Sequence, residues 1–442
     1  MNTNQSYNML KILGAYSFLI VGDIATVNAE SIDTKNTSAV VTQASKTEVP
    51  VTAPAIKSLS DALKHGHAYL GLRYRYEGVD DDAQSKNANA STLRTRLGFE
   101  TAEYQDIKGT LEVEGVHHIG NDLYNDTING KTNYPVVADP EGTEINQAFL
   151  AYSGITETTL KAGRRILNLD DERFVGEVGW RQNSQTFDGV EVSNSTIEDT
   201  TLFYNWNYQV NRVLGKDSEK GIFNSQAHFF NIRNKSVSGL DITAFSYLLD
   251  LRNADPSSSA TYGIRANGKT AITSRLDWLY DASYAYQNDY AENPVSYSAS
   301  YYHIASGIGQ KSLQTLVGYE VLGSDDGVSS FQTPLATLHK FNGWADMFLT
   351  TPGSGLKDYY GKIAGNLGDI STTFTNINFE LVFHDFRAEE GGKHYGTEWD
   401  YMLSKPVGVD SSVALHYADY QAIDNARDTS KIWVSLITKF SS

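Results

Sequence analysis

Residues 162–190, AGRRILNLDDERFVGEVGWRQNSQTFDGV, bring four arginines together with several acids and two glutamines and show no hydrophobic period. Guanidinium groups can bind a carboxylate or sulfate, in bidentate fashion where the geometry allows. Acids and amides around them would hold them in place. The stretch therefore predicts a charged pore lining or anion site, with a catalytic carboxylate site and a metal site as alternatives. Its candidate residues are Arg164, Arg165, Asp170, Asp171, Glu172, Arg173, Arg181, Gln182, Gln185 and Asp188.

Neither a catalytic site nor a metal site fits the acids and histidines of the chain well. Asp170 and Asp171 are adjacent in a loop, so they do not flank one glycosidic bond at the separation that its hydrolysis needs. His117 and His118 are neighbours in a predicted strand, so they point to opposite faces and cannot chelate one metal together. His384 and His416 have no nucleophile signature near them. We expect no catalytic residue, no metal and no cofactor.

From about residue 67 onward, segments of about ten residues alternate in polarity with a period of two. In HAYLGLRYRYEGV, Arg73 and Arg75 lie on one face, and Ala68, Leu70, Leu72, Tyr74 and Tyr76 lie on the other. In STLRTRLGFET, Arg94 and Arg96 take the charged face. Such strands are typical of a membrane barrel whose aromatic face meets lipid and whose charged face lines a lumen. We expect these four arginines in the lumen, with Glu77 and Glu100 as partners.

The strands and their connections predict the fold. About 18 strands begin near residues 67, 92, 109, 143, 158, 187, 200, 224, 240, 260, 271, 295, 311, 356, 373, 394, 410 and 430. Connections after even-numbered strands are short, whereas several after odd-numbered strands are long and acidic, such as 78–90, 120–142 and 323–355. The prediction is all-β: a transmembrane antiparallel β-barrel of about 18 strands with short periplasmic turns and long extracellular loops. A secreted soluble β domain would not show this asymmetry.

The N-terminus predicts export. Lys11 precedes the apolar run 12–21, and Val27, Asn28 and Ala29 supply small residues at a cleavage point before Glu30. We expect residues 1–29 to be a Sec-type signal peptide, 30–60 a flexible N-terminal linker and 61–442 the transmembrane β-barrel. No stretch is apolar for long enough to form a membrane-spanning helix. The expected location is the bacterial outer membrane.

The net charge of the chain restricts which partners it can bind. The formal net charge of −17 argues against nucleic acid. The expected partners are outer-membrane lipid and lipopolysaccharide around the barrel and a small hydrophilic or anionic solute inside it, and the protein is expected to be a monomer. Acids outnumber bases, 53 to 36, so their place in the lumen or in the outer loops decides the selectivity.

Two outer loops are expected to act on the solute. Residues 168–186 form the third outer loop, which often folds inward in porins and narrows the pore. The alternative is that its charges pair only to pin the loop against the wall. Residues 337–349 lie in the seventh outer loop, where the spacing of Leu338, Phe341, Ala345 and Phe348 predicts a short helix. This segment either brings Lys340 into the solute path or only packs the barrel.

Four long motifs carry a family resemblance: residues 70–79, 133–154, 163–190 and 335–360. Together they resemble the alginate-export family of outer-membrane β-barrel porins, from about residue 59 to the end. The resemblance implies a monomeric barrel of 18 strands with a charged, arginine-rich constriction. One departure is the end of the chain, KFSS, because outer-membrane barrels commonly finish on an aromatic residue.

The predicted function is a porin or channel for passive diffusion of small hydrophilic, anionic solutes, with uronate oligosaccharides as candidates. Within the same fold, the alternative is an exporter of an anionic polysaccharide such as alginate. Alternatives of other classes are an outer-membrane hydrolase and a secreted binding domain.

Overall fold

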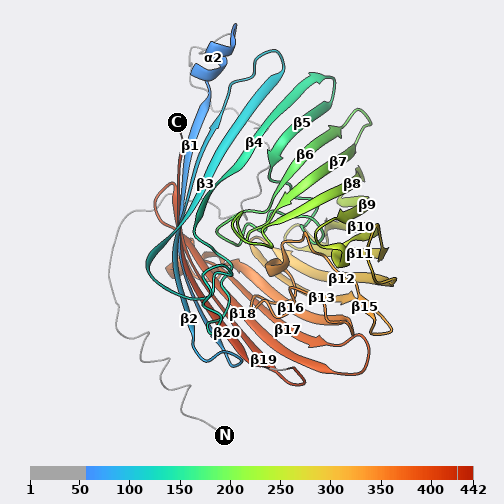
Figure 1. Ribbon diagram of the computed structural model, residues 1–442. Helices are drawn as coiled ribbons and strands as arrows, with labels where there is room; N and C mark the ends of the chain where they lie inside the picture. The colour runs from blue at the N-terminus through green and yellow to red at the C-terminus, as the bar shows by residue number, and fades with distance from the viewer. Residues whose placement is uncertain (1–55, 426, 442) are drawn as a thin grey trace.

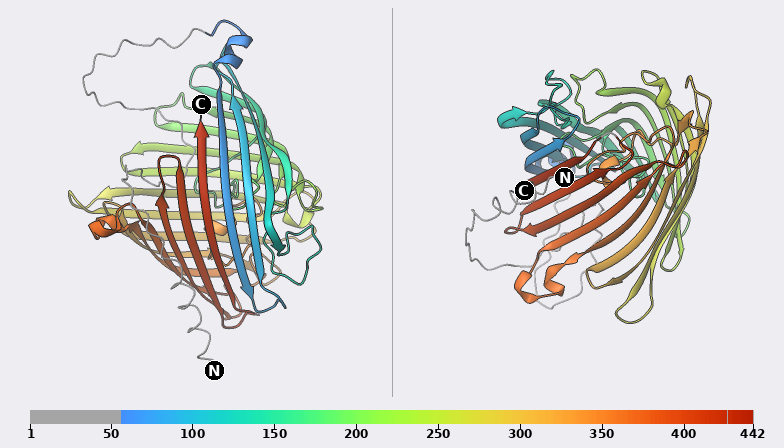
Figure 2. Two further views of the ribbon diagram at one scale, coloured as in Figure 1. Left: turned by 90° about the vertical axis from the view of Figure 1, so that its left-hand side faces the viewer. Right: turned by 90° about the horizontal axis from the view of Figure 1, so that it is seen from below.

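The structure, a computed structural model, describes residues 56–425 and 427–441. One antiparallel sheet of 18 strands closes on itself, because β1 (His67–Asp81) pairs with both β2 (Ala88–Glu100) and β20 (Thr429–Ser441). Strands of the near and far walls cross in projection, as tilted strands of a barrel do (Figure 1, Figure 2). The predicted fold class and strand number are confirmed.

The remaining elements follow in chain order. The other barrel strands are β3 (Ile107–Leu123), β4 (Gly142–Ile155), β5 (Thr158–Arg165), β6 (Thr186–Asn194), β7 (Thr200–Asn211), β8 (Ile222–Val237), β9 (Leu240–Leu251), β10 (Ser259–Ala271), β11 (Asp277–Asp289), β12 (Ser298–Gln310), β13 (Leu313–Leu322), β16 (Leu356–Asn366), β17 (Asn378–Arg387), β18 (His394–Pro406) and β19 (Ser411–Ala422). The small elements are the hairpin β14 (Ser324–Asp325) and β15 (Ser329–Ser330), the helix α2 (Leu59–Lys64), and the 3-10 helices η1 (Asp255–Ser257), η2 (Leu338–Lys340), η3 (Leu367–Asp369) and η4 (Thr372–Phe374).

Alternation along the strands gives the barrel an apolar outer face. Leu97 and Val317 are 60% and 63% exposed, whereas the inward Arg73 and Arg75 are buried. Exposed leucines and valines surrounding a buried charged interior are the reverse of a soluble core, and they suit a sheet whose outer face meets lipid. None of the helices in the described residues is long and apolar enough to cross a bilayer.

The connections show the expected asymmetry, but the long connection expected at 78–90 spans only 82–87, because β1 and β2 extend into it, and three strands begin later than expected. Turns 156–157, 238–239 and 311–312 are short, and both ends of the barrel chain lie on this side, whereas 124–141, 166–185 and 323–355 are long outer loops. The strand expected near 373 begins instead at Asn378. The reason is local, because Asn366 and Ser371 accept hydrogen bonds from backbone N–H groups and form the turns η3 and η4. The strands expected near 271 and 295 begin at Asp277 and Ser298.

The N-terminal segment is described only from residue 56. The expected signal peptide, 1–29, lies outside the described residues, as does most of the expected linker, 30–60. The helix α2 crosses the boundary expected at residue 60, and Ser58 caps it by accepting a hydrogen bond from Asp61 N. It lies beside the start of β1, on the side of the short turns (Figure 1).

The helix expected over 338–348 is wrong except for the three residues of η2. Asn342, Gly343 and Asp346 have left-handed backbone angles, φ 54°, 85° and 61°, which end helical geometry. At Gly343 a Cβ would lie 2.3 Å from Glu398 Oε2, so a larger residue would displace that carboxylate as well as strain the backbone. Phe348 is nevertheless buried, because contacts with the wall rather than a local helix position it.

Candidate functional site

The third and seventh outer loops join inside the barrel. We call residues 166–185 loop 3 and residues 323–355 loop 7. Val175 and Leu335, both buried, form a parallel bridge, and Gly176 N donates to Leu335 O at 2.9 Å. Gln185 Nε2 donates to the carbonyls of Gly176 and Leu335 at 2.8 and 3.0 Å. The two loops therefore form one unit, called the loop plug below.

Asp346 anchors the loop plug to the wall. Its carboxylate accepts hydrogen bonds from Arg181 at 3.2 Å and Lys431 at 2.7 Å, and lies 2.7 Å from His339 Nδ1. Burial raises the pKa of Asp346, but Lys431, His339 and Arg181 outweigh it and hold that pKa well below its usual range. These four residues are called the Asp346 hub below.

Arg181 connects the hub to β1, which is the neighbour of β20 in the barrel, and to the second outer loop. Its Nη1 lies 3.1 Å from Glu77 Oε2 in β1 and 3.9 Å from Asp139 in the second outer loop. Burial lowers the pKa of Arg181, but the carboxylates of Glu77, Asp139 and Asp346 outweigh it, so the pKa is raised. Arg181 stays charged and pairs with carboxylates of β1 and of two outer loops.

Arg173 makes the second anchor. It donates to Glu320 Oε1 on β13 at 2.7 Å and to Thr333 and Asn342 of loop 7 at 3.1 Å each. Its guanidinium lies 4.8 Å from the ring centroid of Phe341. Burial lowers the pKa of Arg173, but Glu320 outweighs it, so this arginine is also fixed in its charged form.

Five cations face the lumen on three neighbouring strands. The register sets Arg73 directly opposite Arg94, and places Arg96 and Lys439 on either side of Gly71. With Arg75 they are called the basic face below. The parity predicted for Arg73, Arg75, Arg94 and Arg96 agrees with this register. Lys439 has the same parity in β20 as the buried Ser435.

Few carboxylates contact the basic face directly. Within residues 56–425 and 427–441, Arg96 is the only one of the five with a carboxylate contact, to Glu114. Arg73 donates to Gln182 Oε1 at 2.8 Å and to the carbonyls of Gly179 and Arg181 in loop 3.

Arg75 and Arg94 are two further members of the basic face, and their contacts differ. Arg75 donates to Trp180 O, and its guanidinium lies 4.3 Å from the centroid of the Trp180 ring. Over the part of the chain that the structure describes, Arg94 makes no side-chain hydrogen bond and no ion pair, and its Nε is buried.

The partners expected for these arginines need correction. Glu77 pairs with Arg181 rather than with the basic face, and Glu100 pairs with Lys108 at the other end of β2. The predicted parity agrees with the register, but the choice of partner depends on loop 3, which places Arg181 against β1 beside Glu77.

The acids of loop 3 also bind elsewhere than expected. Asp170 accepts from Asn231 at 2.9 Å, and Asp171 lies 3.2 Å from Arg265. Glu172 accepts from Thr337 at 2.6 Å and from Lys340 at 3.3 Å. These acids do not hold the loop 3 arginines, because the loop turns them towards other strands and towards loop 7. Burial and the neighbouring Asp171 raise the pKa of Asp170.

Strand alternation separates Arg164 from Arg165. Arg165 is 1% exposed and binds Glu191 inside the barrel at 3.0 Å. Arg164 lies on the opposite face and donates to both oxygens of Asp188, at 2.7 and 2.8 Å. Because β4 and β5 pair in register, this face is the exposed face of Leu150. The pair is therefore directed away from the lumen.

Several residues of the site were not predicted from the sequence. Lys431 and Lys439 follow the inward parity of β20, so alternation could have found them. Glu320 and Asp346 meet arginines of loop 3 that are distant in sequence, and no local signal marks them. Gln182 was expected, and its Nε2 donates to Thr92 Oγ1 at 2.8 Å.

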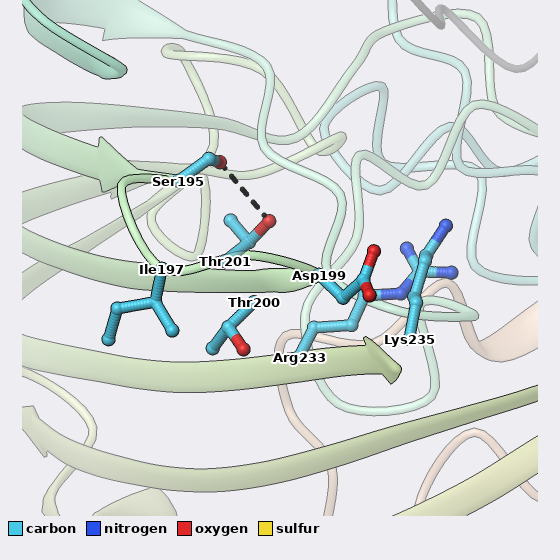
Figure 3. A pocket seen from close by; sticks show the side chains of 7 residues that line it. All are labelled: Ser195, Ile197, Asp199, Thr200, Thr201, Arg233 and Lys235. Atoms are coloured by element: carbon cyan, nitrogen blue, oxygen red, sulfur yellow. Dashed lines mark hydrogen bonds between the residues drawn. The ribbon is translucent and has the colours of Figure 1, made fainter. Parts of the chain in front are cut away.

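The candidate catalytic histidines include one that lies against the loop plug, since His416 packs edge-on against Trp180 and Trp344. Across the described ranges, none of His117, His118, His384 and His416 is hydrogen-bonded to a serine or threonine, so no hydrolase triad forms around them. A separate hollow of about 230 Å³ lies by the turn between β6 and β7 (Figure 3). Its cations Arg233 and Lys235 both contact Asp241.

The hub should make stability depend on pH through His339. Burial lowers the pKa of His339 to about 4, with Asp346 opposing and Arg181 and Lys431 adding to the shift. The unfolded chain takes up this proton near pH 6.5, so the folded state loses stability as pH falls from about 6.5 to 4. We expect a loss of up to about 3 kcal/mol that is missing in His339→Gln. Urea unfolding of both proteins between pH 7 and pH 4 checks it, and parallel curves would contradict it.

Comparison with known proteins agrees with this architecture. The chain matches the Alginate export family over residues 67–296, more than half of its length. No curated protein matches it. Among solved structures, OccAB4 of Acinetobacter baumannii is similar with a TM-score of 0.69 and 12% identity, covering 85% of this chain and 98% of that chain. OccK1 (OpdK) of Pseudomonas aeruginosa is similar with a TM-score of 0.66 and 11% identity, covering 86% and 100%. These likenesses concern the fold, whereas the family match and the closed barrel assign the chain to the alginate-export family of outer-membrane β-barrel porins.

Proposed function

We propose that this porin passes small hydrophilic anions by passive diffusion and prefers anions over cations. The observation that carries the proposal is the basic face. Arg73 and Arg94 oppose each other directly, an arrangement that is unfavourable without a negative partner. Carbonyl oxygens bind Arg73 and Arg75 without cancelling their charge, and no carboxylate of the described residues contacts either guanidinium, so an anion can supply a direct partner.

Release of the solute matters as much as its capture. Most other lumen cations are paired with carboxylates, as Arg165 is with Glu191. A wall that is only locally positive attracts an anion without holding it along the whole path. Uronate oligosaccharides suit this arrangement, because each ring offers one carboxylate to the basic face and hydroxyls to the polar wall. We propose them as candidate solutes.

Export of a polymer such as alginate is the second candidate within this fold. An uncompensated run of lumen cations favours it. The loop plug opposes it, since buried ion pairs of Arg173 with Glu320 and of Arg181 with Glu77 pin the loop plug to the wall. A polymer would require these anchors to open, whereas a small solute would not.

Further parts of the assignment remain proposals. We propose that the barrel acts as a monomer without a cofactor, surrounded by outer-membrane lipid and lipopolysaccharide. We also propose that residues 1–29 direct export and that most of 30–60 is a linker.

Ion selectivity tests the proposed function. In a planar bilayer under a low-salt KCl gradient, the reversal potential should show a preference for chloride. Arg94→Gln should lower the chloride-to-potassium permeability ratio by about fivefold, since one charge acting through a partly hydrated lumen is worth about 1 kcal/mol. Arg252→Gln, which removes a half-exposed arginine of an outer loop, is the matched control and should change the ratio little. A wild-type preference for potassium would refute the proposal.

A further inference from the structure

Glu177 is the acid of loop 3 that lies over the basic face. Ser184 Oγ links its carboxylate to Arg96, and it lies near enough to Arg94 and Lys439 to act on them electrostatically. Among the described residues it nevertheless forms no ion pair within 4.0 Å, and its carboxylate accepts only from Asn168 at 3.2 Å and Ser184 at 3.5 Å. It therefore differs from the other buried or half-buried acids of the lumen, most of which contact a cation directly.

Hydrogen bonds fix Glu177 in this position. Ser184 Oγ accepts from Arg96 and donates to Glu177, so one hydroxyl links the carboxylate to the basic face. Arg73 binds the carbonyl of Gly179, two residues further along the loop. Asn168 binds both the backbone N–H and the carboxylate of Glu177.

The backbone next to Glu177 is strained. Val178 has a φ of +53°, a conformation that a β-branched residue adopts at a cost of about 1–2 kcal/mol. It is held there by a hydrogen bond from its N–H to Thr337 Oγ1 of loop 7, at 3.1 Å. Strain of this kind persists where the surroundings impose it, and it is concentrated at functional sites.

We propose that Glu177 is a specificity-determining residue, the tethered counter-ion of the basic face that a solute anion must displace. Because no direct ion pair has to break, a solute carboxylate can take its place at Arg94 and Lys439 and leave again. Glu177 then weakens the binding of every anion and favours those with enough charge or enough carboxylates to compete with it. This inference rests on the proposed anion preference of the pore.

The test uses Glu177→Gln, which keeps the size of the side chain and one acceptor oxygen for Asn168 and removes the charge. In the bilayer, the chloride-to-potassium permeability ratio should rise, and block of the current by sodium glucuronate should need roughly tenfold less glucuronate. Glu219→Gln removes the same charge from an exposed outer loop and should leave both quantities near their wild-type values.

The outcomes separate the two proposals. Wild-type channels that prefer potassium would refute the proposed function itself. Channels that prefer chloride, lose that preference in Arg94→Gln and show no change in Glu177→Gln would refute only the role of Glu177. If Glu177→Gln fails to fold, Glu177→Asp withdraws the charge by one methylene, and an unchanged glucuronate block in that variant would overturn the inference.

Discussion

Asp346→Asn is expected to free the loop plug from the wall and to raise single-channel conductance. The carboxylate joins Lys431 of β20 to Arg181 of loop 3 in a buried site. An amide cannot compensate two buried cations, and removing one partner from such a cluster typically costs about 3–5 kcal/mol. Because loops 3 and 7 are hydrogen-bonded to each other, both should move when this anchor is lost.

Conductance and proteolysis measure this release. Asp346→Asn channels should conduct more and fluctuate more, and intact cells or proteoliposomes should show faster cleavage within loop 7. Asp326→Asn, at an exposed position of the same loop, is the matched control and should behave as wild type. Asp346→Asn combined with Lys431→Met removes the stranded cation and should restore part of the closed state. A folded Asp346→Asn barrel with wild-type conductance and proteolysis would contradict the anchoring role.

The sequence predicted the wall well because the wall obeys a local rule. Alternation with a period of two is a property of each strand, so the inward direction of Arg73 and Arg94 could be inferred without knowing their neighbours. The same alternation places Arg164 and Arg165 on opposite faces of β5. Extended to the end of that strand, it predicts that Arg164 points away from the lumen. The residues of the turns were less informative, because the capped turns that follow Asn366 move the start of β17 to Asn378.

The contacts of the loop plug were harder to predict from the sequence, because they join residues that are far apart in the chain. Arg173 and Glu320 are 147 positions apart, and nothing in either local segment indicates the other. Long-range contacts also decide the conformation of loop 7. Its apolar residues have helical spacing, but contacts of Ala345 and Phe348 with the wall override that local preference. Charge composition could be read from the sequence, but the pairing of charges required the fold.

The ion pair of Arg173 and Glu320 should show the largest difference between single and double variants. Arg173→Met leaves Glu320 buried without its cation, and Glu320→Leu leaves Arg173 without its anion. Each single variant should lose about 3–5 kcal/mol of unfolding free energy. Arg173→Met with Glu320→Leu should recover most of that loss, because apolar groups of similar size leave neither charge unpaired.

Denaturant unfolding of the refolded barrel, followed by tryptophan fluorescence, measures this cycle. Recovery should stop short of wild type, because Tyr301 donates to Glu320 at 2.7 Å and would keep a buried hydroxyl without that acceptor. Arg387→Met disrupts the exposed pair with Asp385 and should cost no more than about 1 kcal/mol. Single variants of the buried pair that cost as little as Arg387→Met would mean that the pair is solvated, and loop 3 would then be held chiefly by its contacts with loop 7 and by Arg181.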